Sequence, residues 1–328
     1  MTSIKQKNIY LFSPSFFSYD HSIKNELSRQ GAHVYLYDER PFNSTIGKAI
    51  IRVNKKKLIN RYLLKYYMDI ILPKINSIDY IIFINPESIQ PFIIKKIKLL
   101  NPSIKIIVYM WDSFKNKPSA IKLIKHSDSF ITFDPNDAKN YNLKFLPLFF
   151  IPEYSHNNHL DPSDMLYNFS FIGTAHSDRY DLVNKITDSF DKLFKFFYTP
   201  SKFVFLYKKY ILKELAGLPY NSVSTVPMSR EQVITVVQNS SIIIDINHPL
   251  QVGLTMRTIE TLGAKKKLIT TNKEVAKYDF YHPNNILIFT NETTTNDIID
   301  FAKKSLFELK SDIYHSYSLQ NWVRRLFS

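Results

Sequence analysis

The sequence has no cysteine, only six glycines and only two tryptophans among its 328 residues. Without cysteine the chain has neither a disulfide framework nor a cysteine-based metal site, which is compatible with a reducing compartment. The GxGxxG fingerprint of nicotinamide- and flavin-binding proteins does not occur, and neither do GxxxxGK[ST] of P-loop NTPases or GxSxG of α/β-hydrolases. HExxH and Asp-x-Asp are missing too, so no sequence motif indicates a metal.

Long apolar runs are also missing. No stretch reaches about 18 uninterrupted apolar residues, the length that a membrane-spanning helix needs. The apolar run within residues 1–12 is too short for a signal peptide. We therefore expect a soluble protein of the cytoplasm. Its hydrophobic content of 45% is sufficient for two folded cores.

Short apolar, β-branched runs alternate with helical patterns along the chain, and its length favours two domains. We predict strands or extended stretches at residues 8–12, 33–37, 80–84, 105–110, 129–133, 144–149, 168–172, 241–246, 267–271 and 285–289. We predict helices at residues 20–30, 57–72, 89–100, 119–125, 178–190, 202–215, 229–238, 255–262, 296–309 and 317–327. Such alternation implies parallel strands with helical crossovers, that is, an α/β fold of two Rossmann-like, doubly wound domains.

The positive charge is unevenly distributed. The net charge is +14; residues 1–150 carry 23 Lys+Arg against 11 Asp+Glu, and residues 151–328 carry 20 against 18. Residues 48–65 hold seven cationic residues and no acidic one, interleaved with apolar residues, and residues 93–100 repeat this pattern. Basic amphipathic segments of this kind bind anionic membrane surfaces. A solvated helix face or nucleic-acid binding remain alternatives, although no recognisable RNA- or DNA-binding motif accompanies the charge.

The most informative stretch is residues 241–272, which has the pattern strand, loop, helix, strand. Pro249 and Gly253 lie in the predicted loop, and Gly263 suits the C-terminal end of the predicted helix. In open parallel sheets, ligands bind at the carboxyl ends of strands, where helix N-termini present free N–H groups.

The start of that helix suits a phosphate or diphosphate. Gly253 permits close backbone approach, Thr255 offers a hydroxyl, and Arg257 offers a positively charged fork. Glu260 follows Arg257 by three residues, on the same helical face, where a ribose diol would lie. Alternatively, Arg257 and Glu260 form an ordinary solvated pair. The stretch assigned to the phosphate is Gly253, Leu254, Thr255, Met256 and Arg257.

At these residues the chain resembles a known family. The run GLTMRTIETLGAKKKLITTN, followed by YDFYHPNNILIF, looks like the nucleotide-sugar half of bacterial GT-B glycosyltransferases, in particular the CgeB-like and lipopolysaccharide or capsule biosynthesis branch. The resemblance implies that the helix N-terminus holds the donor diphosphate and that Glu260 holds the ribose. Many retaining enzymes of this class have two glutamates eight residues apart. Here the first position is Val252, so the stereochemistry does not carry over.

The resemblance also implies a domain arrangement, with two domains facing a central cleft. Residues 151–167 are polar, contain two prolines and lack periodicity, which is typical of a linker. We predict an acceptor-binding domain at residues 1–155 and a nucleotide-sugar domain at residues 156–312. Residues 313–328 are predicted to form a helix that packs back on the first domain.

Further donor contacts are predicted in the second domain. Gly173 and Thr174 follow a predicted strand and form a tight loop, and Arg179 lies near a helix start, although a plain surface arginine is equally compatible. His248 and Gln251 lie in the loop before Gly253. A lone loop histidine is more often structural than catalytic.

If sugar transfer inverts the configuration of the sugar, a base must take a proton from the acceptor hydroxyl. Asp20 and His21 follow the first predicted strand, and Asp112 follows the fourth; Glu87 is a weaker candidate. Alternatively, Asp20 caps the first helix and Asp112 merely forms a turn.

The sequence therefore predicts a glycosyltransferase that moves a sugar from a nucleotide-sugar donor to a lipid-linked, lipopolysaccharide or capsule glycan. It requires no metal or other cofactor and works at the inner face of the cytoplasmic membrane, bound through its basic first domain, without nucleic acid. The alternatives are a polyol-phosphate or sugar-phosphate polymer transferase and an inactive nucleotide- or nucleic-acid-binding protein. Alanine at position 257 or 260 is predicted to abolish donor binding and leave the fold intact.

Overall fold

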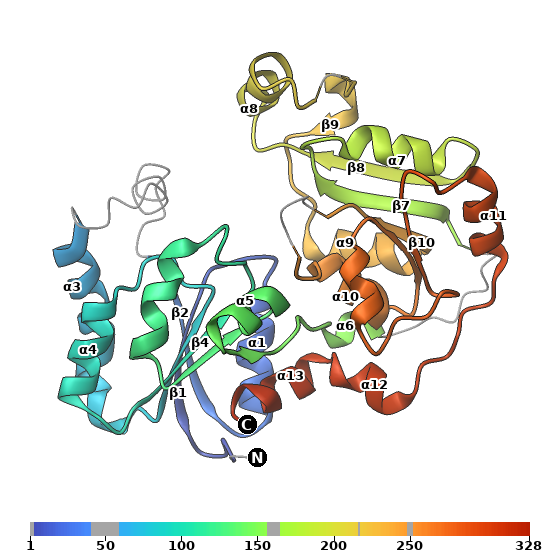
Figure 1. Cartoon of the computed structure of the whole chain (residues 1–328). Helices are drawn as coiled ribbons and strands as arrows, with labels where there is room; N and C mark the ends of the chain where they lie inside the picture. The colour runs from blue at the N-terminus through green and yellow to red at the C-terminus, as the bar shows by residue number, and fades with distance from the viewer. Residues whose placement is uncertain (1–2, 41–58, 156–164, 216, 248–251) are drawn as a thin grey trace. The chain divides into compact units, whose positions relative to one another are not determined.

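The computed structural model describes residues 3–40, 59–155, 165–215, 217–247 and 252–328. The chain forms two compact units (Figure 1). Unit 1 comprises Met1–Leu148 and Leu319–Ser328, and unit 2 comprises Phe149–Ser318. The first division falls seven residues before the position predicted from the linker composition, and the C-terminal segment is counted with unit 1.

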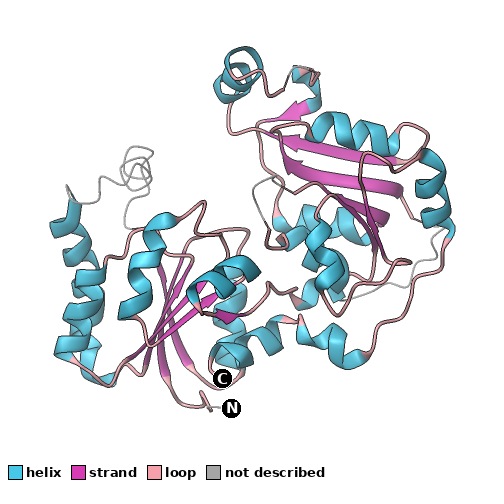
Figure 2. Cartoon of the chain, in the orientation of Figure 1, coloured by secondary structure: helices cyan, strands magenta, loops and turns pink. Residues whose placement is uncertain are grey.

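Unit 1 is built on a parallel six-stranded sheet with the order β2-β1-β3-β4-β5-β6. Helices lie on both sides of the sheet (Figure 2). The strands are β1 (Asn8–Ser13), β2 (His33–Asp38), β3 (Tyr80–Ile84), β4 (Lys105–Met110), β5 (Ser129–Thr132) and β6 (Lys144–Phe145). The helices are α1 (Tyr19–Arg29), α3 (Asn60–Ile71), η2 (Leu72–Ser77), α4 (Pro91–Leu100), η3 (Pro118–His126), α5 (Pro135–Tyr141) and α13 (Leu319–Leu326).

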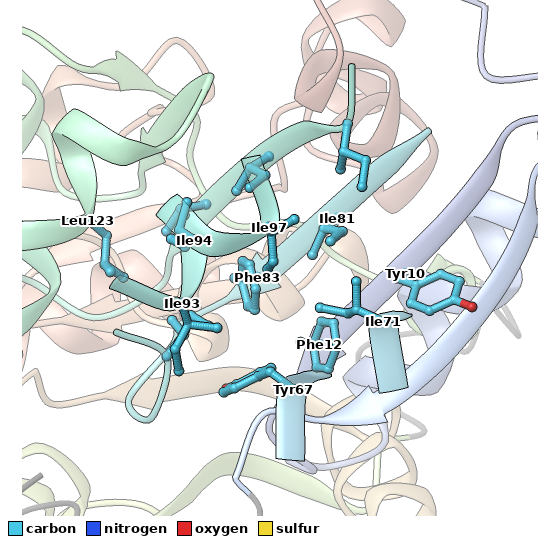
Figure 3. Packing of buried hydrophobic residues seen from close by; sticks show 14 of the residues in the cluster. Tyr10, Phe12, Tyr67, Ile71, Ile81, Phe83, Ile93, Ile94, Ile97 and Leu123 are labelled. Carbon is cyan, nitrogen blue, oxygen red and sulfur yellow. The ribbon is translucent and has the colours of Figure 1, made fainter. Parts of the chain in front are cut away.

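Strand alternation sends every second side chain to one face of this sheet, where α3, α4 and η3 cover it. Phe12 stacks on Phe83 of the neighbouring strand with ring centroids 5.2 Å apart, and Tyr67 of α3 packs on Phe12 at the same centroid distance (Figure 3). Ile93 and Ile97 of α4 are fully buried against this layer. The pairing register of the strands is therefore fixed. A shift of one strand by one residue would move its whole row of apolar side chains to the opposite face.

The last helix, α13, completes unit 1. Its buried side chains are Leu319, Trp322, Val323 and Leu326, the i, i+3, i+4, i+7 spacing of one helical face. Trp322 meets Tyr109 of β4 edge-on at 4.8 Å between ring centroids. Lys144 donates to the carbonyls of Arg325 and Ser328 at the end of the helix.

Unit 2 contains a second parallel six-stranded sheet, of order β12-β11-β10-β7-β8-β9. Counted from its own first strand, this is the Rossmann order, with the reversal between β7 and β10. The strands are β7 (Tyr167–Thr174), β8 (Leu193–Tyr198), β9 (Val223–Ser224), β10 (Ser240–Asp245), β11 (Lys267–Thr270) and β12 (Ile286–Ile288). The helices are α6 (Pro152–Ser155), α7 (Arg179–Thr187), α8 (Lys202–Leu206), η5 (Tyr207–Ile211), η6 (Tyr220–Ser222), α9 (Arg230–Gln238), α10 (Met256–Gly263), η7 (Lys273–Lys277), α11 (Thr295–Lys303) and α12 (Ser311–Ser316).

The predicted α/β fold of two Rossmann-like domains is confirmed, and several local predictions need correction. β8 and β9 are not predicted from the sequence. The single helix predicted at residues 202–215 is a short α-helix followed by the π-helical turn η5, and the helix predicted at residues 119–125 is the 3-10 helix η3. The prediction that Gly263 lies at the C-terminal end of its helix is confirmed, since it is the last residue of α10, and Lys265, two residues later, has a positive φ of 51°.

Candidate active site

The carboxyl ends of β7 and β10 lie side by side in unit 2, because these two strands pair directly in parallel. This is the point where the strand order reverses, which is where open α/β sheets bind ligands. Gly173 and Thr174 are the last two residues of β7, so the prediction that they form a loop after the strand is wrong, and Asp245 ends β10. The loop after β10 leads to α10, so the residues predicted for the donor gather at this edge.

Asp245 fastens the start of α10 to the sheet. Its Oδ2 accepts hydrogen bonds from the hydroxyls of Thr255 and, at 2.7 Å, Thr258. Thr255 is the N-cap of α10, and its Oγ1 accepts from the backbone N–H of Thr258 at 3.2 Å. Capping satisfies N–H groups that a helix start otherwise leaves open, so the orientation of this helix end is fixed.

The loop between β10 and α10 is also tied to the end of β11. The hydroxyl of Thr271 donates to Oδ1 of Asn247 at 2.6 Å, and the Asn247 backbone N–H donates back to that hydroxyl. Farther along, Nδ2 of Asn272 donates to the carbonyl of Val252 at 3.2 Å. His248 and Gln251, predicted to contact the donor, lie outside the described residues. Both ends of this loop are held by hydrogen bonds.

Arg257 and Glu260 form an ion pair in the first turns of α10, with Nη1 and Oε2 2.7 Å apart. The side chains are largely buried, so the alternative of a solvated surface pair is wrong. Tyr154 of α6 is buried beside them, and burial, followed by the charge of Glu260, raises the pKa of its phenol well above the usual range. The buried guanidinium of Arg257 and carboxylate of Glu260, one helical turn apart, form a rigid polar cluster with the phenol of Tyr154.

Arg179 belongs to the same edge of the sheet. It is the first residue of α7, and its Nη1 donates to the carbonyl of Thr174 at 3.1 Å. Burial lowers the pKa of this guanidinium, and the charge of Asp245 opposes the shift. Arginine stays charged even so. A Cβ at Gly173 would lie 2.7 Å from Cζ of Phe171 and 3.3 Å from Nη1 of Arg179, so a side chain there is excluded without rearrangement.

The predicted donor residues that the structure describes are thus grouped around one sheet edge. Gly253 and Leu254 are buried, Met256 is half-buried, and the Thr174 side chain is exposed. Two arginines and a helix N-terminus provide the positive potential that a phosphate or diphosphate needs. No group of three or more metal-ligating side chains occurs in the described part of the chain.

In unit 1 the candidate base Asp20 is buried in the first turn of α1. The N-cap of that helix is Ser18, so the alternative of Asp20 as the cap is wrong. Within the described residues, Oδ1 of Asp20 has no hydrogen-bond partner, and Oδ2 lies 3.9 Å from Nε2 of the mostly exposed His21. Burying a carboxylate oxygen that has no hydrogen-bond partner costs free energy. Such an oxygen is typical of functional positions.

Asp112, after β4, has a different environment. Its Oδ2 accepts from Nδ2 of Asn85 at 3.1 Å and lies 3.8 Å from Nζ of Lys117. Burial raises the pKa of Asp112, and its hydrogen bonds partly offset the shift. Glu87, the weaker candidate, is ion-paired with Lys117. A carboxylate with a raised pKa suits a general base better than one held by a salt bridge.

The loops that carry Asp20 and Asp112 are in contact. Phe16, in the β1–α1 loop, packs against Trp111 with ring centroids 6.3 Å apart. Phe16 and Phe17 are also substantially exposed. Aromatic side chains beside candidate carboxylates suit the apolar face of a sugar ring. Direct interaction between the two carboxylates is not seen in the described residues.

The hydrogen bond from Asn85 allows a test of Asp112. Asn85 has a positive φ of 45°, so Asn85→Gly removes the amide without straining the backbone. A hydrogen bond donated to a carboxylate stabilises its charged form, so losing that donor raises the pKa of the carboxyl group. The pKa of Asp112 should therefore rise further. The pH dependence of its side-chain carboxyl ¹³C chemical shift measures this change, and the acid limb of any activity that uses Asp112 as base should move to higher pH.

Asn142→Gly is the matched control, because Asn142 also has a positive φ, of 51°, and is exposed at the end of α5. It should leave the titration of Asp112 unchanged. An unchanged or lowered pKa in Asn85→Gly would show that the amide does not stabilise the carboxylate.

The supporting residues of the donor edge are not predicted from the sequence. Tyr154 lies in a stretch interpreted as linker, where no periodicity signals a buried side chain. Asp245 is the last residue of β10, and the structure shows that it anchors the start of α10. An acidic residue at a strand end, ten residues before an N-cap threonine, is the one signal that was available.

A cavity of about 650 Å³ in unit 2 lies beside α10 and the amino ends of β11 and β12. Lys265, Lys266, Leu268 and Ile286 line it, together with Thr258 of α10. Thr258 also donates a hydrogen bond to Asp245, so the cavity adjoins the helix that carries the donor residues.

No family model and no curated protein matches this chain. Solved structures do match. HepE (Alr3699) of Anabaena in complex with UDP-glucose aligns over 98% of both chains with a TM-score of 0.61 and 10% identity. AviGT4, a glycosyltransferase involved in avilamycin A biosynthesis, aligns over 98% of this chain and 96% of its own with a TM-score of 0.55 and 9% identity. The UDP-GlcNAc 2-epimerase of Neisseria meningitidis bound to UDP-GlcNAc aligns over 98% of both chains with a TM-score of 0.53 and 10% identity.

At such low identity these likenesses establish the fold. Two Rossmann-like domains in one chain, with these structural neighbours, form the GT-B fold, which confirms the predicted fold class. The described residues contain no helix of the length and apolar character that crossing a bilayer requires.

Proposed function

We propose that this protein is a glycosyltransferase that takes its sugar from a nucleotide sugar bound at the β7–β10 edge of unit 2. The observation that carries the proposal is the buried Arg257–Glu260 pair in the first turns of α10, at the reversal of strand order. The fold comparison supports it, because proteins of this fold have been crystallised with UDP-glucose and with UDP-GlcNAc.

Each residue has a chemical task in this proposal. Arg257, Arg179 and the N-terminus of α10 offset the negative charge that develops on the departing diphosphate, and such preorganised donors stabilise a transition state strongly. The carboxylate of Glu260 accepts hydrogen bonds from the ribose hydroxyls. Sugar transfer passes through an oxocarbenium-like state in which the leaving group departs early. No residue in this scheme requires a metal.

The base is proposed to come from unit 1. Asp112 has a raised pKa, and Asp20 is buried with one oxygen that has no partner within the described residues. Either carboxylate can take the proton of an acceptor hydroxyl, with His21 as a third candidate beside Asp20.

The acceptor is proposed to be a lipid-linked, lipopolysaccharide or capsule glycan, as in the CgeB-like branch that the sequence resembles. The basic excess of residues 1–150 supports binding at an anionic membrane surface, and the proposed location is the inner face of the cytoplasmic membrane.

A second candidate is a nucleotide-sugar epimerase. It is favoured by one observation, the fold match to the UDP-GlcNAc 2-epimerase, which uses the same two-domain frame. An epimerase changes the sugar of its substrate without a glycan acceptor, whereas a transferase releases a nucleoside diphosphate.

The test is a panel of nucleotide sugars, first for thermal stabilisation and then for turnover. A ligand that binds only the native state raises the melting temperature by mass action, so at least one donor should shift it and the bare sugars should not. Diphosphate release that depends on a bacterial glycan fraction supports the transferase. Epimerised donor without an acceptor supports the second candidate, and no stabilisation by any nucleotide sugar contradicts both.

A further inference from the structure

Unit 2 exposes an apolar stripe on the helical segment α8–η5. Leu206 ends α8 and Tyr207 begins η5, so the helical path continues without a break. Five of its side chains are exposed at positions i, i+3, i+4, i+7 and i+8, the spacing of one helical face. They are Phe203 (86%), Leu206 (38%), Tyr207 (53%), Tyr210 (66%) and Ile211 (68%).

The opposite side of this segment anchors it to unit 2. Phe205 is 1% exposed and belongs to the core of unit 2. Lys209 donates to the carbonyl of Leu218 at 2.7 Å, and Lys208 donates to the carbonyl of Ala175 at 3.3 Å. The stripe is therefore held outward by the fold. Figure 1 shows α8 standing out from the rest of unit 2, on the side of the edge strand β9.

A contiguous exposed stripe of this composition marks an interaction surface rather than ordinary surface scatter. Its charge indicates the partner. Residues 202–213 contain no acidic residue, and Lys202 and Lys213, at the two ends of the segment, are exposed, whereas Lys208 and Lys209 are bonded to carbonyls of unit 2. A second copy of the chain would bring the same two exposed lysines together across an isologous interface, which like-charge repulsion disfavours. The complementary partner is anionic and accepts apolar side chains.

We propose that the α8–η5 stripe inserts into the headgroup region of an anionic lipid bilayer. A protruding helix with aromatic and aliphatic side chains on one face and lysines beside it is the form of interfacial membrane helices. Tyr207 and Tyr210 suit this depth, because a tyrosine ring has an apolar body and a polar tip. The exposed Lys202 and Lys213 add attraction to anionic headgroups. The inference is independent of the transferase activity, and it uses residues other than the basic first half of the chain.

The test uses sedimentation with two kinds of vesicle, pure phosphatidylcholine and an equal mixture of phosphatidylcholine and phosphatidylglycerol. The variant Phe203→Ser/Tyr210→Ser/Ile211→Ser changes only exposed side chains, so the fold should be retained. Its partition coefficient on mixed vesicles should fall at least about tenfold, because three apolar side chains leave the interface. Leu166→Ser is the matched control, since Leu166 is 61% exposed in the same unit but outside the stripe, and it should bind as the wild type does.

A reporter variant, Phe203→Trp, adds a direct measure of insertion. Its fluorescence should shift to the blue with mixed vesicles and stay unchanged with pure phosphatidylcholine. The proposal is overturned if the triple variant binds mixed vesicles as tightly as the wild type, if the wild type does not sediment with them, or if the reporter does not shift. It is also overturned if the triple variant only dissociates an oligomer in the absence of lipid. Thermal stabilisation by nucleotide sugars, measured on the same variant, reports separately on the transferase proposal.

Discussion

Alanine at position 257 or 260 is expected to reduce strongly the thermal stabilisation that a nucleotide sugar gives. A charge-assisted hydrogen bond contributes about 1.5–3 kcal/mol, so each variant should lose roughly 10- to 100-fold in donor affinity. Isothermal calorimetry with the donor identified in the nucleotide-sugar panel measures this loss. Both side chains are expected to contact the donor, Arg257 at the diphosphate and Glu260 at the ribose.

The sequence also predicted that alanine at position 257 or 260 leaves the fold intact. The structure changes that expectation. The side chains of Arg257 and Glu260 are only 15% and 7% exposed, so each single variant removes one charge of a buried ion pair and leaves the other charge buried. Breaking such a pair costs about 3–5 kcal/mol. The double variant Arg257→Met/Glu260→Leu removes both charges and should recover most of this stability without recovering binding. Urea unfolding distinguishes the two effects.

Glu274 and Lys277 provide the control for this experiment. They form an ion pair with the same i,i+3 spacing in the same unit, 2.8 Å apart, but Lys277 is largely exposed. Alanine at either position should change stability by no more than about 1 kcal/mol and should not change donor affinity. Wild-type affinity in both the Arg257 and Glu260 variants would remove the donor-site assignment.

Trp322→Ala should destabilise unit 1 by about 3–5 kcal/mol, the cost of deleting a large aromatic side chain from a core. Trp322 is 1% exposed and packs on Tyr109, so little room exists for the neighbours to relax without leaving a cavity. Urea unfolding followed by far-UV circular dichroism should show the transition of unit 1 moving to lower denaturant while that of unit 2 stays in place.

Trp322→Phe keeps most of the apolar volume and should cost much less than the alanine variant. The assignment of the last helix to the core of unit 1 would be wrong if Trp322→Ala shifted the unfolding transition of unit 2 instead. It would also be wrong if neither transition shifted. The result does not depend on any ligand, so it tests the architecture separately from the function.

The sequence predicted most of the two sheets because many of their strands are short apolar runs, rich in β-branched residues and largely buried. β4, for example, reads KIIVYM and has five buried residues in succession. β8 was missed because its pattern is weak. In LFKFFY only Phe197 is fully buried and Lys195 is exposed, so neither a buried run nor strict alternation stands out. β9 has two residues, too few for any periodic signal.

The donor residues could be predicted because a strand, a loop and a capped helix follow one another in residues 241–263. Contacts between segments distant in sequence could not. Nothing in the sequence indicates that Phe150 requires a glycine at position 263, where a Cβ would lie 2.5 Å from its ring. The same holds for Tyr154 beside Arg257 and Glu260, a contact across about a hundred residues. Such partners are set by tertiary packing, which local pattern does not encode.

The division of the chain has a consequence for its synthesis. The residues up to Leu148 leave the ribosome before unit 2, but the helix that carries Trp322 belongs to their core and is made only after unit 2. Unit 1 therefore finishes folding only after all of unit 2 has emerged. Until then the part of the β-sheet around Tyr109, on which Trp322 packs, lacks this cover, and a chain that stops short of residue 319 leaves it so permanently.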